Sequence, residues 1–331
     1  MRIMPPEDYI LARDVCSYGY FRLAPNVWDR DRKVLRRSLM LDDGPAMFEI
    51  AQPGAAWRGA ARGAGAGSPL EVRVDRVLSS RERGDAVRMI SRMLRLDEDA
   101  GVIAAFHRVD PRWKRTGHGR VFRSPTLFED IIKTVTSCNV QWASTIIMNR
   151  RLCDVLGGTP ELRRAAQRAT GGYPATLIPF PTPLQLARAR VSTLRARCRV
   201  GYRDQRMKEL AAMCVRRGGR AAEIDEAWFE DPATSDKAIH ERLLTLPGIG
   251  PYAAANIMQT LGRYARLPMD TETLKHGRTV LGFSGTDRQV LKRVAAYFAP
   301  FGEHTFRSYW FEMWLRYEEQ HGPAHAWPER T

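Results

Sequence analysis

Residues 241–270 read ERLLTLPGIGPYAAANIMQTLGRYARLPMD, and this stretch decides the fold. Within it, the turn LPGIG at residues 246–250 joins two stretches with helical periodicity. Two glycines around one apolar residue permit a tight turn whose backbone N–H groups lie at the positive end of the following helix. Such a turn can hold a phosphate oxygen without reading base sequence. Glycines between helices often do no more than allow the chain to turn. The turn alone therefore does not establish phosphate binding.

Asp270 follows the second helix and precedes a helical run over residues 272–280. An aspartate at this position can cap the helix. A fixed carboxylate can also stabilise a developing positive charge, and orient or deprotonate a water nucleophile. The two roles are compatible in one residue.

The LPGIG turn, the Ala-rich helix after it and Asp270 together resemble the helix-hairpin-helix (HhH-GPD) DNA glycosylase superfamily. The nearest branches are the 8-oxoguanine and the 3-methyladenine (alkyl-purine) glycosylases. The resemblance implies that Asp270 is the catalytic carboxylate and that the hairpin binds a DNA phosphate. It also implies a potassium or sodium ion among the hairpin carbonyls of residues 246–250. The hairpin residues expected to contact DNA are Leu246, Gly248, Ile249 and Gly250.

Tyr252 occupies the place just after the hairpin where strand-cleaving members of this superfamily carry a lysine. Because tyrosine cannot form an imine with the sugar, the resemblance implies a monofunctional glycosylase that leaves an abasic site. Tyr252 is then a DNA-binding residue. Lys275, one turn after Asp270, is the only nearby lysine, and we interpret it as a phosphate contact.

The resemblance extends upstream over residues 119–152, GRVFRSPTLFEDIIKTVTSCNVQWASTIIMNRRL. Base flipping leaves a gap in the duplex, and the superfamily fills it from the loop after this first helix. Asn139 is at the matching position, with Gln141 beside it, and both are expected to contact DNA. Trp142 is either a pocket residue or an ordinary core residue.

The expected base pocket combines two distant segments. Residues 15–22, VCSYGYFR, resemble the strand through which the N-terminal domain of the 8-oxoguanine branch touches the flipped base. The C-terminal helix supplies aromatic and polar side chains suited to stacking on a base, although such a stripe is more often core. A carboxylate in an aromatic pocket needs a hydrogen-bonding partner such as a base amine, which singles out Glu312. The expected pocket residues are Gly19, Tyr20, Phe21, Trp142, Tyr309, Glu312 and Met313.

The fold class expected from periodicity is α+β. Residues 9–95 contain short alternating runs, such as MFEIAQ and LEVRVDRVLSS, that predict an antiparallel sheet. Residues 54–68 are almost all Gly, Ala, Arg and Ser, which predicts a mobile loop between strands. From about residue 96 onward the periodicity is helical. We therefore predict a β-rich N-terminal domain over residues 1–103 and an all-helical glycosylase domain over residues 104–331.

The net charge and the cysteine positions indicate which kinds of partner and cofactor the protein binds. Lys and Arg number 52 against 37 Asp and Glu, a net charge of +15 that favours a polyanionic partner, here double-stranded DNA with a modified base. All five cysteines precede Asp270 and none forms a CxxC pair, so neither an iron–sulfur cluster nor a structural zinc is expected. No stretch suits a bilayer span or a signal peptide. We expect a cytoplasmic, nucleoid-associated monomer without a cofactor.

The sequence thus predicts a monofunctional DNA N-glycosylase that acts in base excision repair or against modified foreign DNA. Alkylated purines, oxidised purines and 5-substituted cytosines, among them phage bases, are alternative substrates. Three other classes remain open: a bifunctional glycosylase and abasic-site lyase, a non-catalytic helix-hairpin-helix protein that only binds DNA, and an enzyme that acts on RNA.

Overall fold

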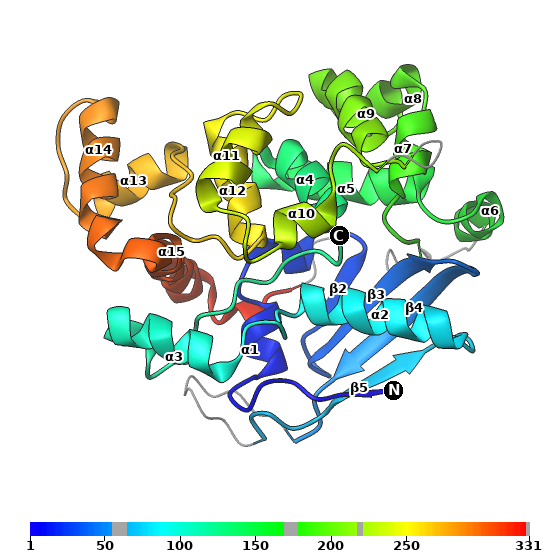
Figure 1. Cartoon of the computed structure of the whole chain (residues 1–331), viewed down its shortest axis with the longest axis horizontal. Helices are drawn as coiled ribbons and strands as arrows, with labels where there is room; N and C mark the ends of the chain where they lie inside the picture. The colour runs from blue at the N-terminus through cyan, green and yellow to red at the C-terminus, as the bar shows by residue number, and fades with distance from the viewer. Residues whose placement is uncertain (55–64, 169–177, 217–220, 329–331) are drawn as a thin grey trace.

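The computed structural model describes residues 1–54, 65–168, 178–216 and 221–328. Most of the predicted loop at residues 54–68 falls on residues 55–64, which lie outside the described part. The described chain forms an N-terminal antiparallel sheet and a larger set of helices (Figure 1). The α+β fold class is therefore confirmed.

The sheet has five strands in the spatial order β1-β5-β4-β3-β2, and every neighbouring pair is antiparallel. Inward and outward side chains alternate along β4, and this alternation is the period-2 pattern that predicted the sheet. Its strands are β1 (Arg2–Ile3), β2 (Asn26–Asp29), β3 (Val34–Leu41), β4 (Gly44–Ala51) and β5 (Leu70–Val74).

The prediction of strands throughout residues 9–95 is wrong at three places, where the chain is helical. These elements are α1 (Leu11–Val15), the 3-10 helix η1 (Gly19–Arg22) and α2 (Ser80–Met93). The segment expected to form a pocket strand, residues 15–22, therefore contains the end of α1 and the whole of η1. Helix α2 starts because Ser79 and Glu82 form a capping box, a local signal that the strand reading overlooked. It lies across the sheet in Figure 1.

The rest of the chain is helical, as expected. Its elements are α3 (Ala100–Val109), η2 (Pro111–Trp113), α4 (Leu127–Ser137), α5 (Trp142–Leu156), α6 (Pro160–Arg168), α7 (Pro183–Arg188), α8 (Val191–Ala196), η4 (Gly201–Arg203), α9 (Asp204–Met213), α10 (Glu226–Glu230), α11 (Asp236–Leu244), α12 (Pro251–Thr260), α13 (Thr271–Thr279), α14 (Asp287–Phe298), η5 (Ala299–His304), α15 (Thr305–His321) and η6 (Ala324–Ala326). No helix among the described residues has the length and apolar character that a membrane span needs.

Two hydrophobic cores organise these elements. One core joins the sheet and α2 to the C-terminal helices α14 and α15, and it contains Phe48, Ile90, Val294 and Phe311. The other lies among the central helices, from α4 to α12. The predicted domain boundary between residues 103 and 104 falls within α3. The first and last parts of the chain thus share one core, and the central helices form the other.

Candidate active site

The LPGIG turn connects α11 to α12, and its apolar residues anchor it in the central core. Leu246 and Ile249 are buried, whereas Gly248 and Gly250 are exposed. Gly248 has a φ of +75°, a left-handed conformation that favours glycine. Gly250 is the N-cap of α12, and it has no side chain with which to satisfy the N–H groups of the first turn. The N–H groups of this first turn can therefore donate hydrogen bonds to an anion.

Asp270 lies at the start of α13, where it is the N-cap. Its Oδ1 accepts hydrogen bonds from the Thr273 backbone N–H at 2.8 Å and from Thr273 Oγ1 at 3.0 Å. The Thr273 hydroxyl in turn lies 2.7 Å from the Tyr309 hydroxyl. Helix capping and a second side chain thus fix the orientation of this carboxylate.

Burial raises the pKa of Asp270 above its ordinary value of 3.8, because the charged form loses solvation. The hydrogen bonds from Thr273 act in the opposite direction, and so does one from Tyr252, while the negative charge of Glu272 raises the pKa further. The carboxylate is thus poised between burial, which favours its acid form, and hydrogen bonds that favour its ionised form.

Tyr252 lies on the first turn of α12 and reaches across to Asp270. Each of the two groups affects the pKa of the other, and the pKa of Tyr252 is raised by burial and by the Asp270 charge. Asn256, one turn later, donates to the Tyr252 carbonyl at 3.0 Å and lies 3.5 Å from the Tyr18 hydroxyl. The hairpin helix and the N-terminal segment therefore converge on the same carboxylate.

The expected pocket residues divide into buried and partly exposed groups. Tyr20, Phe21, Tyr309 and Met313 are each at most 7% exposed and contribute to the core. Trp142 is half-buried against Gly19, where a β-carbon would lie 2.9 Å from the indole ring. The absence of a side chain at Gly19 therefore makes room for Trp142.

Glu312 already has partners within the protein. Its Oε1 lies 2.8 Å from His276 Nε2, and its Oε2 accepts a hydrogen bond from Arg112. Both contacts lower the pKa of this carboxyl. Glu312 therefore has the hydrogen-bonding partners that its position requires, supplied within the protein by His276 and by Arg112, which is 200 residues away in sequence.

Asn139 and Gln141 are exposed in the turn between α4 and α5. Asn139 has a φ of +54°, in the left-handed region that asparagine tolerates better than most residues. Its amide nitrogen lies 3.4 Å from the hydroxyl of Tyr202, a side chain that is 55% exposed. Sequence reasoning missed Tyr202, although the run VGYRDQR places an aromatic residue after a glycine and among arginines. Lys275 is also exposed, on α13.

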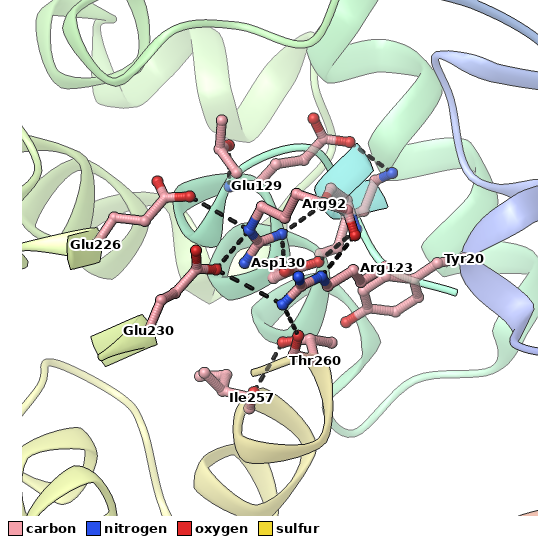
Figure 2. A network of polar contacts seen from close by, with 12 residues as sticks. Tyr20, Arg92, Arg123, Glu129, Asp130, Glu226, Glu230, Ile257 and Thr260 are labelled. Carbon is pink, nitrogen blue, oxygen red and sulfur yellow. Dashed lines mark hydrogen bonds and ion pairs between the residues drawn. The ribbon is translucent and has the colours of Figure 1, made fainter. Parts of the chain in front are cut away.

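A buried network of arginines and carboxylates fixes the far end of α12 (Figure 2). Arg123 Nη1 donates to the Thr260 carbonyl at 3.0 Å, and Arg95 Nη2 donates to the same carbonyl at 2.9 Å. Positive charge at the C-terminus of a helix is favourable because the carbonyls there carry a partial negative charge. Through α12 this network positions the hairpin and Tyr252.

The network also ties α2 to the central helices. Arg92 on α2 donates to Asp130 Oδ2 on α4 at 2.9 Å and to Glu230 Oε1 on α10 at 2.5 Å. Arg92 and Asp130 are both almost completely buried. Among the described residues, no group of three or more His, Cys, Asp or Glu side chains could hold a metal ion.

Comparison with solved structures shows that the fold is that of known DNA glycosylases. The 3-methyladenine DNA-glycosylase from Archaeoglobus fulgidus matches 96% of this chain and 98% of its own, with a TM-score of 0.64 and 16% identity. The apo form of the Clostridium acetobutylicum 8-oxoguanine glycosylase/lyase matches 89% of this chain and 92% of its own, with a TM-score of 0.55 and 15% identity.

The Clostridium enzyme in complex with double-stranded DNA, in which cytosine lies opposite 8-oxoguanine, matches 91% of this chain and 93% of its own. The TM-score is 0.55 and the identity 15%. No model of a known protein family matches the chain, and no curated protein matches it either. The chain therefore shares the fold of these enzymes.

Proposed function

We propose that this protein is a monofunctional DNA N-glycosylase that flips a modified base out of duplex DNA and hydrolyses its N-glycosidic bond. The observation that carries the proposal is Asp270, a partly buried and oriented carboxylate beside the first helical turn after the hairpin. The fold shared with the 3-methyladenine and 8-oxoguanine glycosylases supports the reaction class.

In the proposed reaction the exposed hairpin amides hold a backbone phosphate, while Asn139 and Tyr202 fill the gap left by the flipped base. The base departs with the electron pair of its bond to C1′, and positive charge develops on the sugar. Ionised Asp270 stabilises that charge. A water molecule then adds its oxygen to C1′ and transfers a proton to Asp270, which leaves an abasic site.

Tyr252 supports the monofunctional proposal because it occupies the position that faces Asp270, and it has no amine with which to attack the sugar. The implied potassium or sodium ion fits the hairpin, since Leu246 O accepts one N–H, from Ile249, and a carbonyl has a second lone pair. The ion would help to hold the phosphate.

The test measures release of free base from duplexes that carry alkylated purines, oxidised purines or 5-substituted cytosines, and detects abasic sites by alkali cleavage. We expect the wild type to release one class. Asp270→Asn should lower the rate by about 10²-fold to 10³-fold, because a preorganised charge is lost from the transition state. Asparagine still caps a helix, so duplex binding and the melting temperature should be retained.

The outcomes separate the competing functions. Strand cleavage without alkali, together with a borohydride-trapped adduct, would support the bifunctional alternative. Equal release by wild type and Asp270→Asn would refute the role of Asp270. Duplex binding without release from any substrate of the panel would favour the non-catalytic DNA-binding alternative.

A further inference from the structure

An arginine-rich segment borders the hairpin on the side away from Asp270. Residues 188–206, RARVSTLRARCRVGYRDQR, contain seven arginines and a single acidic residue, Asp204. We call these residues the arginine segment. The structure exposes six of the arginines, namely Arg188, Arg190, Arg195, Arg197, Arg199 and Arg206.

Most of these guanidinium groups have no acidic partner in the part of the chain that the structure describes. Among the described residues, only Arg195 of the six forms an ion pair, with Asp204 at 2.7 Å. Asp204 itself is only 2% exposed and so contributes little negative charge at the surface. Five exposed arginines therefore remain without a neutralising carboxylate, which raises the local positive potential.

The arginine segment is firmly folded, so its charges have defined positions. Leu194, Cys198 and Val200 are completely buried and anchor it to the central core. Lys208 Nζ donates to the carbonyls of Ala187 and Ala189, at 2.8 and 2.5 Å. A charged surface that is already ordered loses little conformational entropy when it binds a partner.

The segment adjoins both parts of the proposed DNA-binding surface. A β-carbon at Gly248 would lie 2.5 Å from Arg206 Cδ, so this arginine packs directly against the hairpin. The ring of Tyr202 lies beside Asn139 and beneath the guanidinium of Arg206, 5.8 Å from the ring centre. Figure 1 shows α13 on one side of α11 and α12, and α8 and α9 on the other.

We propose that the arginine segment binds backbone phosphates of the duplex on the side of the hairpin opposite Asp270. The inference rests on the proposed function and extends its DNA-binding surface beyond the hairpin. Arginine suits this role because its planar guanidinium binds phosphate oxygens in pairs and keeps its charge. The contacts are to phosphates, so they add affinity without adding sequence preference.

The test compares two variants with equal changes of charge. One carries Arg188→Gln, Arg190→Gln, Arg197→Gln and Arg199→Gln. The control carries four substitutions of exposed arginines on the sheet and α2, away from the hairpin: Arg2→Gln, Arg73→Gln, Arg81→Gln and Arg83→Gln. Fluorescence anisotropy gives the Kd for an unmodified duplex of 30 base pairs at salt concentrations from about 50 to 200 mM, the range over which phosphate contacts alter affinity strongly.

Each phosphate contact contributes about 0.9 to the slope of log Kd against log salt. We expect the segment variant to lose about 2 to 4 units of slope and to bind more than about tenfold more weakly at low salt. The control variant should keep the wild-type slope. Equal slopes for the two variants would refute the inference, as would tighter wild-type binding to single-stranded RNA than to the duplex. A wild type that fails to bind the duplex would refute the proposed function itself.

Discussion

Asp270 combines a structural and a chemical role in one side chain. As N-cap of α13 it satisfies the Thr273 N–H, and the same bond fixes the carboxylate in position. Its pKa is raised by burial, so the ionised form is held at a cost in stability. Because the folded pKa exceeds the unfolded value, this destabilisation is present above the folded pKa and disappears as pH falls below it.

The pH dependence of activity should follow from the neighbours of Asp270. If ionised Asp270 is needed, log kcat/KM falls as pH decreases through a pKa that lies above 3.8. Tyr252→Phe removes a hydrogen bond that favours the ionised form, so the acid limb should move to higher pH. Glu272→Gln removes a negative charge that raises the pKa, so the limb should move to lower pH.

Glu71→Gln on the sheet provides the control, since it removes an equal charge far from Asp270 and should leave the profile unchanged. The pH profile of kcat/KM for all three variants is obtained from steady-state rates over the pH range in which the protein stays folded. Shifts of Tyr252→Phe and Glu272→Gln in the same direction would contradict the assignment of the acid limb to Asp270.

At the scale of elements, the hairpin depends on its two glycines in different ways. Gly248 has a positive φ, and a side chain there would meet Arg206, whereas no atom lies within 4 Å of a β-carbon at Gly250. Gly248→Ala should lower the free energy of unfolding by about 1–2 kcal/mol, the cost of a left-handed conformation, and weaken duplex binding. Gly250→Ala should cost less than about 1 kcal/mol. Chemical denaturation gives the free energy of unfolding of each variant, and duplex titration gives its affinity for DNA. A larger stability loss for Gly250→Ala than for Gly248→Ala would contradict this account of the hairpin turn.

The buried network connects α2 to the helices that support the site, although α2 lies far from Asp270 in sequence. Arg92→Met would leave Asp130 buried without its charged partner, and should lower the free energy of unfolding by about 3–5 kcal/mol. Arg88→Met, one turn earlier and exposed beside Asp85, should cost at most about 1 kcal/mol. Urea denaturation compares the two. A loss below about 1 kcal/mol for Arg92→Met would mean that burial of the network contributes little to stability.

At the scale of the whole molecule, the shared core makes the N-terminal sheet indispensable to the C-terminal helices. A fragment of residues 104–331 retains α14 and α15 but lacks Phe48, Ile90 and their neighbours, against which these helices pack. We expect the fragment to lack a cooperative thermal transition of the full-length kind, as measured by circular dichroism. It should also bind a hydrophobic dye, because the apolar faces of α14 and α15 become exposed. A fragment that melts cooperatively near the full-length temperature would show that the helical part is independent.

The sequence by itself determined the features that depend on neighbouring residues. Pro247, Gly248 and Gly250 predict a turn between helices, and Asp270 before a helical run predicts a cap, because chain geometry and capping act over a few residues. The alternation in β4 predicts a strand for the same reason. Helix α2 also had a local signal, the Ser79 and Glu82 capping box, which was overlooked in favour of the strand pattern before it.

Only the tertiary structure decided which distant side chains meet. It brought Arg112 to Glu312, Tyr202 to Asn139 and the first strands to the last helices. These contacts join residues at least 63 positions apart, and local preference carries no information about such partners. They form because burial of apolar surface brings the segments together and buried charged groups then require partners.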